Sequence, residues 1–168
     1  MARAPGRDLK IGLAALVVAA LAAIVVVVVG VQRTESKSPT ARGEAIFQSG
    51  VDADGNPIAR SGSAGGGGMM DGGGMMGGGC AGCHGTDGHG RTTPAFTSPN
   101  ITYGNLTDPQ GMLQPDGTRG PTYTDSSLRT AVTQGLDPEG SRLESPMPQW
   151  QLTDQEWNSL LAYLKTLH

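Results

Sequence analysis

The stretch Cys80-Ala81-Gly82-Cys83-His84 is the most informative part of this 168-residue chain. Two thiols separated by two residues and followed at once by an imidazole form the C-x-x-C-H pattern, which is typical of covalent haem attachment. Thiols at this spacing can reach the two vinyl groups along one edge of a porphyrin. The next side chain then lies beneath the ring, where its imidazole can bind iron. We therefore predict one haem c, joined by thioethers to Cys80 and Cys83 and ligated by His84.

Three other interpretations of the two cysteines remain possible at this point. A zinc site usually takes four ligands from two separated pairs, and the nearest further donor here is His89. A thiol–disulfide redox motif is expected in a βαβ pattern, which this sequence lacks. A structural disulfide is the third interpretation. Haem is favoured because the glycine-rich chain after residue 40 is poor in apolar side chains, and a haem would fill its interior.

The sixth iron ligand has several candidates in the sequence. Methionine is common opposite histidine in such sites. Met147 is the best placed, because Pro146 and Pro148 restrict the backbone on both sides of it and a capped helix follows. The other candidates are Met69, Met70, Met75, Met76, Met112 and His89.

Three segments after residue 40 are predicted to be helical. A short helix is expected over Thr40 to Gln48. A second begins near Thr124 or Asp125 and ends at Gly135, because its apolar residues recur at helical spacing. A third begins at Thr153, which forms a capping box with Glu156, and its apolar stripe contains Trp157, Leu160, Leu161, Leu164 and Leu167. Prolines and glycines interrupt Arg91 to Pro121, so loops are expected there, and the predicted fold class is all-α.

An apolar run at residues 11–31 contains no charged side chain. Twenty-one helical residues span about 30 Å, the thickness of the hydrocarbon core of a bilayer. A cleaved signal peptide is the alternative, but its apolar region is usually shorter and ends at a small-residue cleavage site. We predict a single transmembrane helix with Arg3, Arg7 and Lys10 on the cytoplasmic side. The predicted organisation is a cytoplasmic N-terminus at 1–10, an anchor at 11–31, a tether at 32–40 and a haem domain at 41–168 with a Gly/Met-rich insert at about 61–79.

The net charge of the chain is −3, which argues against nucleic-acid binding, since that function needs a basic face. The methionine pairs Met69-Met70 and Met75-Met76 carry an alternative function. Thioethers are soft ligands that suit Cu(I), so the insert could handle or sense copper. A second alternative is a gas-sensing haem protein in which Met147 is displaced.

Three sequence stretches resemble class I cytochromes c. They are C-A-G-C-H-G-x-D-G at Cys80 to Gly88, L-x-x-A-V-x-x-G at Leu128 to Gly135, and M-P-x-W-x-L-T-D at Met147 to Asp154. The resemblance implies the class I fold, with His84 as the proximal ligand and Met147 as the distal ligand. It also implies that an N-terminal helix carrying Gly43 and Phe47 crosses the last helix near Tyr163.

The resemblance has further implications for the surroundings of the haem. Pro94 is expected to offer its carbonyl to the ring N–H of His84. Pro99-Asn100-Ile101 is similar to a segment near the haem propionates in cytochrome subunits of membrane dehydrogenases. The chain departs from the family in the long stretch from Gln48 to Gly79, where a few residues are usual.

The expected function is single-electron transfer, because two axial ligands leave no open site for a substrate; the chain is thus expected to be a carrier and not an enzyme. The expected partners are membrane redox complexes: a quinol–cytochrome c reductase, a terminal oxidase, a photosynthetic reaction centre or a dehydrogenase of which this chain is a subunit. The haem domain is expected on the periplasmic or other extracytoplasmic side of the cell membrane.

Overall fold

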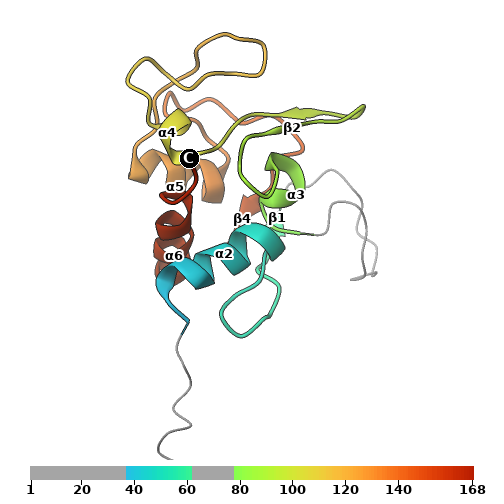
Figure 1. The fold of residues 1–168 in the computed structure, drawn as a ribbon, viewed down its shortest axis with the longest axis vertical. Coiled ribbons are helices and arrows are strands. Elements are labelled where there is room, and N and C mark those ends of the chain that lie inside the picture. Colours follow the sequence, from blue (N-terminus) through green and yellow to red (C-terminus); the bar gives the residue numbers. More distant parts are fainter. Residues whose placement is uncertain (1–36, 62–77) are drawn as a thin grey trace, which may run out of the picture. The chain divides into compact units, whose positions relative to one another are not determined.

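A computed structural model describes residues 37–61 and 78–168, which belong to one folded unit, Lys37–His168 (Figure 1). The elements are α2 (Pro39–Ser49), β1 (Arg60–Ser61), α3 (Ala81–His84), β2 (Arg91–Thr92), β3 (Thr97–Ser98), α4 (Tyr103–Leu106), α5 (Asp125–Gln134), β4 (Gln149–Trp150) and α6 (Asp154–Leu164). The predicted anchor at 11–31 lies outside the described residues. Within the described part, no helix has both the length and the apolar character needed to cross a membrane.

The three longer helices begin and end where their local sequence provides caps. The Ser38 hydroxyl accepts a hydrogen bond from the Ala41 amide at 3.1 Å, and Pro39 opens α2. The capping box of α6 is present, since Glu156 Oε2 accepts from the Thr153 amide at 2.7 Å. Helix α5 has a similar box between Thr124 and Ser127 and ends at Gly135, which adopts a left-handed φ of 67°. The predicted positions of these helices are confirmed.

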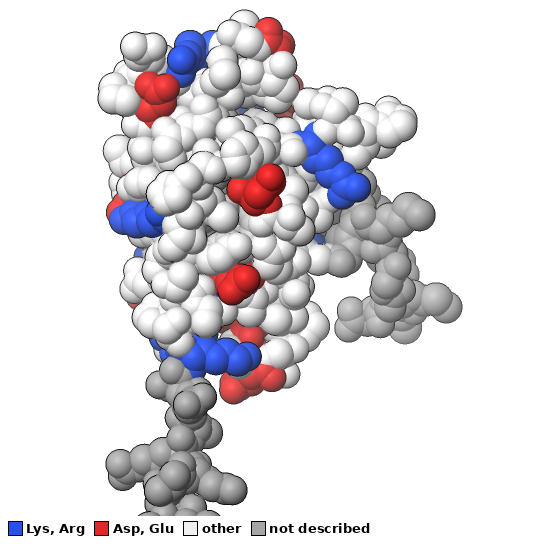
Figure 2. All heavy atoms as spheres, viewed as in Figure 1, with Lys and Arg blue, Asp and Glu red and all other residues white. Residues whose placement is uncertain are grey.

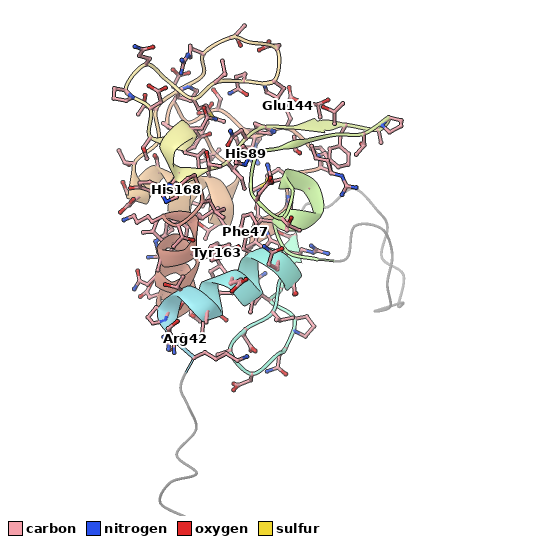
Figure 3. The ribbon with its side chains drawn as sticks, viewed as in Figure 1. Arg42, Phe47, His89, Glu144, Tyr163 and His168 are labelled. Atoms are coloured by element: carbon pink, nitrogen blue, oxygen red, sulfur yellow. The ribbon has the colours of Figure 1, made fainter. Side chains whose placement is uncertain are left out.

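Helices α2 and α6 pack against each other and form the base of the domain (Figure 1). A Cβ atom on Gly43 would overlap the carbonyl oxygen of Ser159, so the glycine allows the two backbones to touch. The rings of Phe47 and Tyr163 meet in the same interface, with centroids 5.3 Å apart and planes at 51° (Figure 3). The predicted crossing of these helices is therefore confirmed.

The core extends from this helix pair to α5 and the loops around it. Leu128 and Ala131 on α5 are buried, as are Met112 and Tyr123 on loops and Trp150 on β4. These side chains form one cluster with Ile46, Phe47, Ile58, Ala81, Leu106, Trp157, Leu160, Leu164 and Leu167.

Four short strands were not expected from the sequence. β1 pairs with β4 and β2 pairs with β3, both antiparallel, and each strand has only two residues. Such ladders form where loops close on one another through backbone hydrogen bonds. Two residues are too few to show the alternating pattern that would predict a strand. The fold remains helical.

Two predicted boundaries differ from the structure. Helix α2 begins at Pro39, because Ser38 and the proline start it, so the predicted tether at 32–40 ends earlier than expected. The predicted insert at about 61–79 also extends too far at both ends. Ser61 belongs to β1, and Gly79 is buried against α2, where a Cβ atom would overlap the Phe47 carbonyl. The four insert methionines lie outside the described residues.

Candidate haem site

The C-x-x-C-H segment forms a single helical turn, α3, directly after the buried Gly79. The amides of Cys83 and His84 both donate to the Cys80 carbonyl, at 3.1 and 2.9 Å. The two cysteines are three residues apart, so this turn places both on the same helical face, and neither is in a disulfide. Gly85 ends the turn with a φ of 82°, a conformation that favours glycine.

The Cys80 thiol is held in its protonated form. Burial raises its pKa to about 12. Because the thiolate is the nucleophile in thiol–disulfide exchange, a thiol with this pKa is a poor participant in that chemistry. The environment of Cys80 therefore does not favour the redox-motif interpretation.

The His84 imidazole is oriented by a backbone carbonyl. Its Nδ1 atom lies 2.9 Å from the Pro99 oxygen, and since a carbonyl can only accept, Nδ1 carries the proton. Burial lowers the pKa of His84, while the bond to Pro99 opposes that shift, so the ring is neutral at pH 7. The Nε2 atom makes no hydrogen bond with the residues of the described ranges. A neutral imidazole with Nδ1 bound and a lone pair on Nε2 is the form that ligates a metal.

The prediction that the Pro94 carbonyl binds His84 is wrong. Pro94 is exposed and lies in the turn between β2 and β3, whereas Pro99 directly follows β3. The antiparallel pairing places Arg91 opposite Ser98, which returns the chain to the Gly90 and His84 region. The Gly90 amide donates to the His84 carbonyl at 2.8 Å. Pro99 therefore reaches the imidazole because of the hairpin, while Pro94 lies in the turn at the other end of the hairpin.

Ser98 strengthens the same side of the site and was missed in the sequence. Its buried hydroxyl accepts from the Arg91 amide at 3.1 Å and donates to the Cys83 carbonyl. The hydroxyl thus joins the hairpin to the C-x-x-C-H turn. The only signal for it was its position before Pro99, in a segment that we had placed near the haem propionates.

Met147 lies on the loop between α5 and β4 and is half-buried. Its amide donates to the Glu144 carbonyl at 3.1 Å, and β4 begins two residues later. Among the other described candidates, Met112 is 3 % exposed and packs in the core cluster, while His89 is exposed and lies 3.5 Å from Asp87. The remaining candidates lie in residues 62–77, outside the described part.

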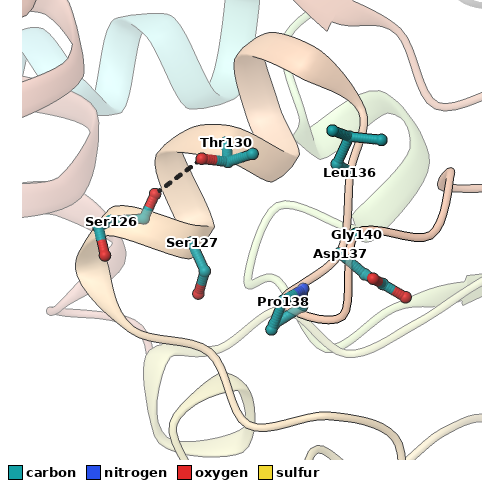
Figure 4. A pocket seen from close by; sticks show the side chains of 7 residues that line it. All are labelled: Ser126, Ser127, Thr130, Leu136, Asp137, Pro138 and Gly140. Carbon is teal, nitrogen blue, oxygen red and sulfur yellow. Dashed lines mark hydrogen bonds between the residues drawn. The ribbon is translucent and has the colours of Figure 1, made fainter.

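A surface cavity of about 330 Å³ is separate from the candidate haem site (Figure 4). It is lined by hydroxyl side chains of α5 and by the loop that follows, including Ser126, Thr130 and Pro138. The Thr130 hydroxyl donates to the Ser126 carbonyl at 3.2 Å, within the helix itself. None of the predicted haem residues lines this cavity.

The residues at the C-x-x-C-H turn suit a covalently bound haem. Two free thiols on one helical turn precede a neutral imidazole whose Nδ1 is tied to a carbonyl, and apolar side chains of the core cluster lie nearby. This set of groups is the one that haem c requires from the protein.

Comparison with known proteins agrees with this chemistry. The family model described as Cytochrome c matches residues 40–168. No curated protein and no solved structure matches the chain. The match implies the all-α class I fold and fits an electron carrier rather than an enzyme. Since the matched region contains the C-x-x-C-H turn and nearly all described residues, the chain belongs to the cytochrome c family and binds covalently attached haem c.

Proposed function

We propose that this protein is a membrane-anchored monohaem cytochrome c that passes single electrons between membrane-bound redox complexes. In this proposal Cys80 and Cys83 form the thioethers, His84 is the proximal ligand and Met147 is the distal ligand. The observation that carries the assignment is the His84–Pro99 hydrogen bond of 2.9 Å, because it leaves Nε2 as the ligating nitrogen. Family membership supports electron transfer in general.

In this mechanism the protein's own residues would bind the haem iron and adjust its reduction potential. The haem iron supplies a one-electron couple. His84, held by Pro99, presents Nε2 in one orientation, and a bound carbonyl on the opposite nitrogen raises the basicity of the ligand. Met147 would ligate the iron through its thioether, and a ligand of this kind would raise the reduction potential. With His84 and Met147 both bound, small molecules would have no open coordination site.

The charge distribution supports weak and reversible docking. Basic and acidic side chains are interspersed on the face shown in Figure 2, with no large area of one sign. A face of this kind gives little electrostatic steering, so a partner that docks on it would be found by proximity. The proposed anchor provides that proximity.

The sequence of the anchor and tether supports the proposed location. Because α2 begins at Pro39, the tether after residue 31 contains at most seven residues, 32–38. Seven extended residues reach about 24 Å, and a flexible chain of that length averages about 15 Å. A domain held this close to the bilayer meets membrane partners at a local concentration in the millimolar range. The partners proposed are a quinol–cytochrome c reductase, a terminal oxidase, a photosynthetic reaction centre or a dehydrogenase.

The experiment uses membranes that contain the full chain and membranes given the fragment from Arg33 at equal total haem. We expect electron flux between quinol and a terminal acceptor to be supported by the full chain and to fall when the dilute fragment replaces it. Equal flux from the fragment would reject the tethered-carrier proposal. N-terminal sequencing of the isolated protein tests the anchor directly, and a mature start near Arg33 would show that residues 11–31 are removed.

A spectrum of the reduced protein with carbon monoxide tests the electron-carrier assignment against gas sensing. The proposal expects no change, because Met147 occupies the sixth position. Rapid binding of carbon monoxide by the wild-type protein would favour the gas-sensing alternative.

A further inference from the structure

The chain between α2 and the Gly/Met-rich insert pairs with β4, the strand that directly follows the loop that carries Met147. Strand β1 pairs with β4 so that Arg60 is opposite Trp150 and Ser61 is opposite Gln149. The Gln151 amide extends the contact by donating to the Ala59 carbonyl at 2.9 Å. This segment belongs to the stretch in which the sequence departs from the usual family spacing. It therefore adds contacts to the distal loop that a shorter connection would not supply.

The side chain of Arg60 adds a second contact on the same residue pair. Its guanidinium carbon lies 5.2 Å from the centroid of the Trp150 ring, within the range of a cation–π interaction. Its Nη1 atom also donates to the Gly78 carbonyl at 2.7 Å. Arg60 thus joins three points of the chain: β1, the indole of β4, and the residues that lead into the C-x-x-C-H turn.

The indole that Arg60 covers is itself tightly enclosed. Trp150 is only 4 % exposed. Gly50 also approaches the ring closely: it has a φ of 69°, and a Cβ there would lie 2.9 Å from Cη2 of the indole. An indole in contact with both Gly50 and Arg60 has little freedom, and its backbone is held by β1.

We propose that Arg60 is a positioning residue for the distal haem ligand, an inference that rests on the proposed ligation by Met147. Only two residues, Pro148 and Gln149, separate Met147 from Trp150, so their Cα atoms lie at most about 11 Å apart. Pro148 lies between them and restricts the backbone further. If the thioether is to leave the iron and be replaced, this short loop must move away. Fixing Trp150 limits that movement, so the contacts of Arg60 favour the methionine-ligated state.

Competition with imidazole measures this effect on the full-length holoprotein. Imidazole binds ferric iron only after the methionine leaves, so its affinity reports how easily the distal loop opens. Four variants are compared with the wild type: Arg60→Ala, Arg60→Lys, Arg119→Ala and Met147→Ala. Arg119 is the matched control, because its Nη1 also donates to a glycine carbonyl at 2.7 Å, that of Gly111, on a different loop. Each protein is also assayed for its reduction potential and its ferric methionine-to-iron charge-transfer band.

Arg60→Ala is expected to bind imidazole about tenfold more tightly, with a weaker charge-transfer band and a lower potential. Arg60→Lys should lie between this variant and the wild type, since lysine keeps the charge but loses the planar fork. Arg119→Ala should stay within about twofold of the wild type. Unchanged imidazole affinity in both Arg60 variants, with the band lost in Met147→Ala, would overturn the role of Arg60 and leave the assignment of Met147 as ligand standing. A band that survives Met147→Ala would overturn the ligand assignment itself. Should Arg60→Ala fail to fold, Arg60→Lys decides the question in the same assay.

Discussion

The two sides of the candidate haem site are supported in different ways. On the proximal side, Pro99 and Ser98 bind His84 and Cys83 across only fifteen residues of sequence, through hydrogen bonds to backbone atoms. On the proposed distal side, Arg60 contacts Trp150 of β4, the strand that follows the Met147 loop, and the two residues are 90 positions apart (150 − 60).

This difference predicts two kinds of failure. The proximal contacts are buried and join residues that are close in sequence, so changing them should reduce stability. The distal contacts assemble only when distant parts of the chain have folded together. Changing them should alter iron ligation and potential while the thioethers keep the haem attached.

The largest effect is expected from Met147→Ala on the distal side. Loss of the thioether opens the sixth position, so reduced protein should bind carbon monoxide. The potential should fall by about 0.2 V, within the roughly 0.8 V range that axial ligands span. Potentiometry and carbon monoxide spectra measure both changes, and denaturing electrophoresis with haem staining should still show attached haem.

The matched variant is Met112→Ala, which removes the other described methionine candidate. Met112 is buried in the core, so this change should lower stability and leave the iron spectrum intact. The opposite result, with the spectrum lost in Met112→Ala and kept in Met147→Ala, would reverse the assignment.

The second largest effect is expected from Gly90→Ala on the proximal side. Gly90 has a φ of 90°, and a Cβ atom would lie 2.6 Å from the Ser98 oxygen and 2.9 Å from the Pro99 carbonyl carbon. Both the backbone strain and the crowding oppose the alanine, so the free energy of unfolding should fall by about 3 kcal/mol. Urea unfolding of the holoprotein gives this value.

Gly117→Ala separates the two causes of that loss. Gly117 has a similar φ of 85° but has no atom within 4 Å of the added Cβ. It should cost only the backbone strain, about 1 kcal/mol. Equal losses in the two variants would mean that the approach of the hairpin to Gly90 adds nothing.

The sequence predicted local features well and long-range contacts poorly. Helix ends were predictable because the signals, such as Thr153 with Glu156 and the glycine after α5, lie within a few residues of the end they determine. The C-x-x-C-H turn is local in the same sense.

Two of the contacts that were not predicted, those of Pro99 and Arg60, required pairings between separate segments. The family resemblance implied Pro94, and nothing in the sequence gives the register of the β2–β3 hairpin, which brings Pro99 to His84 instead. Arg60 showed no sequence signal, since its partner Trp150 is far along the chain and β1 contains only two residues. The distal side was therefore less predictable than the proximal side, because its supporting contacts join segments that are far apart in the sequence.

A smaller effect is expected from Ser98→Ala, which removes one hydroxyl from the proximal side. The Arg91 amide and the Cys83 carbonyl lose their buried partner, so the free energy of unfolding should fall by about 1–2 kcal/mol. The potential should change little, because the His84–Pro99 bond remains. Ser141→Ala is the control, since Ser141 is exposed and should show no loss. A change in potential as large as that of Met147→Ala would contradict the separation of the two sides.

The smallest effect is expected from Asp125→Asn. Asp125 lies on α5 and belongs to neither side of the site. Lys165 donates to Asp125 at 2.7 Å and Tyr103 donates to it at 2.8 Å, and these bonds lower the pKa of Asp125 below 3.8. A lowered pKa means that the carboxylate stabilises the fold above pH 3.8 and that this contribution is lost as the pH falls through the folded-state value. The bond to Asp125 also raises the pKa of Lys165 above 10.5, so that contribution is present below pH 10.5 and is lost at higher pH.

Both side chains are more than 40 % exposed, so Asp125→Asn should lower the melting temperature at pH 7 by only about 2 °C. Melting curves from pH 7 downward test the sign: the difference from the wild type should shrink below pH 3.8, and a difference that grows there would contradict the stabilising role of the carboxylate. The imidazole affinity and the reduction potential should match the wild type throughout, because an ion pair at this position supports neither axial ligand.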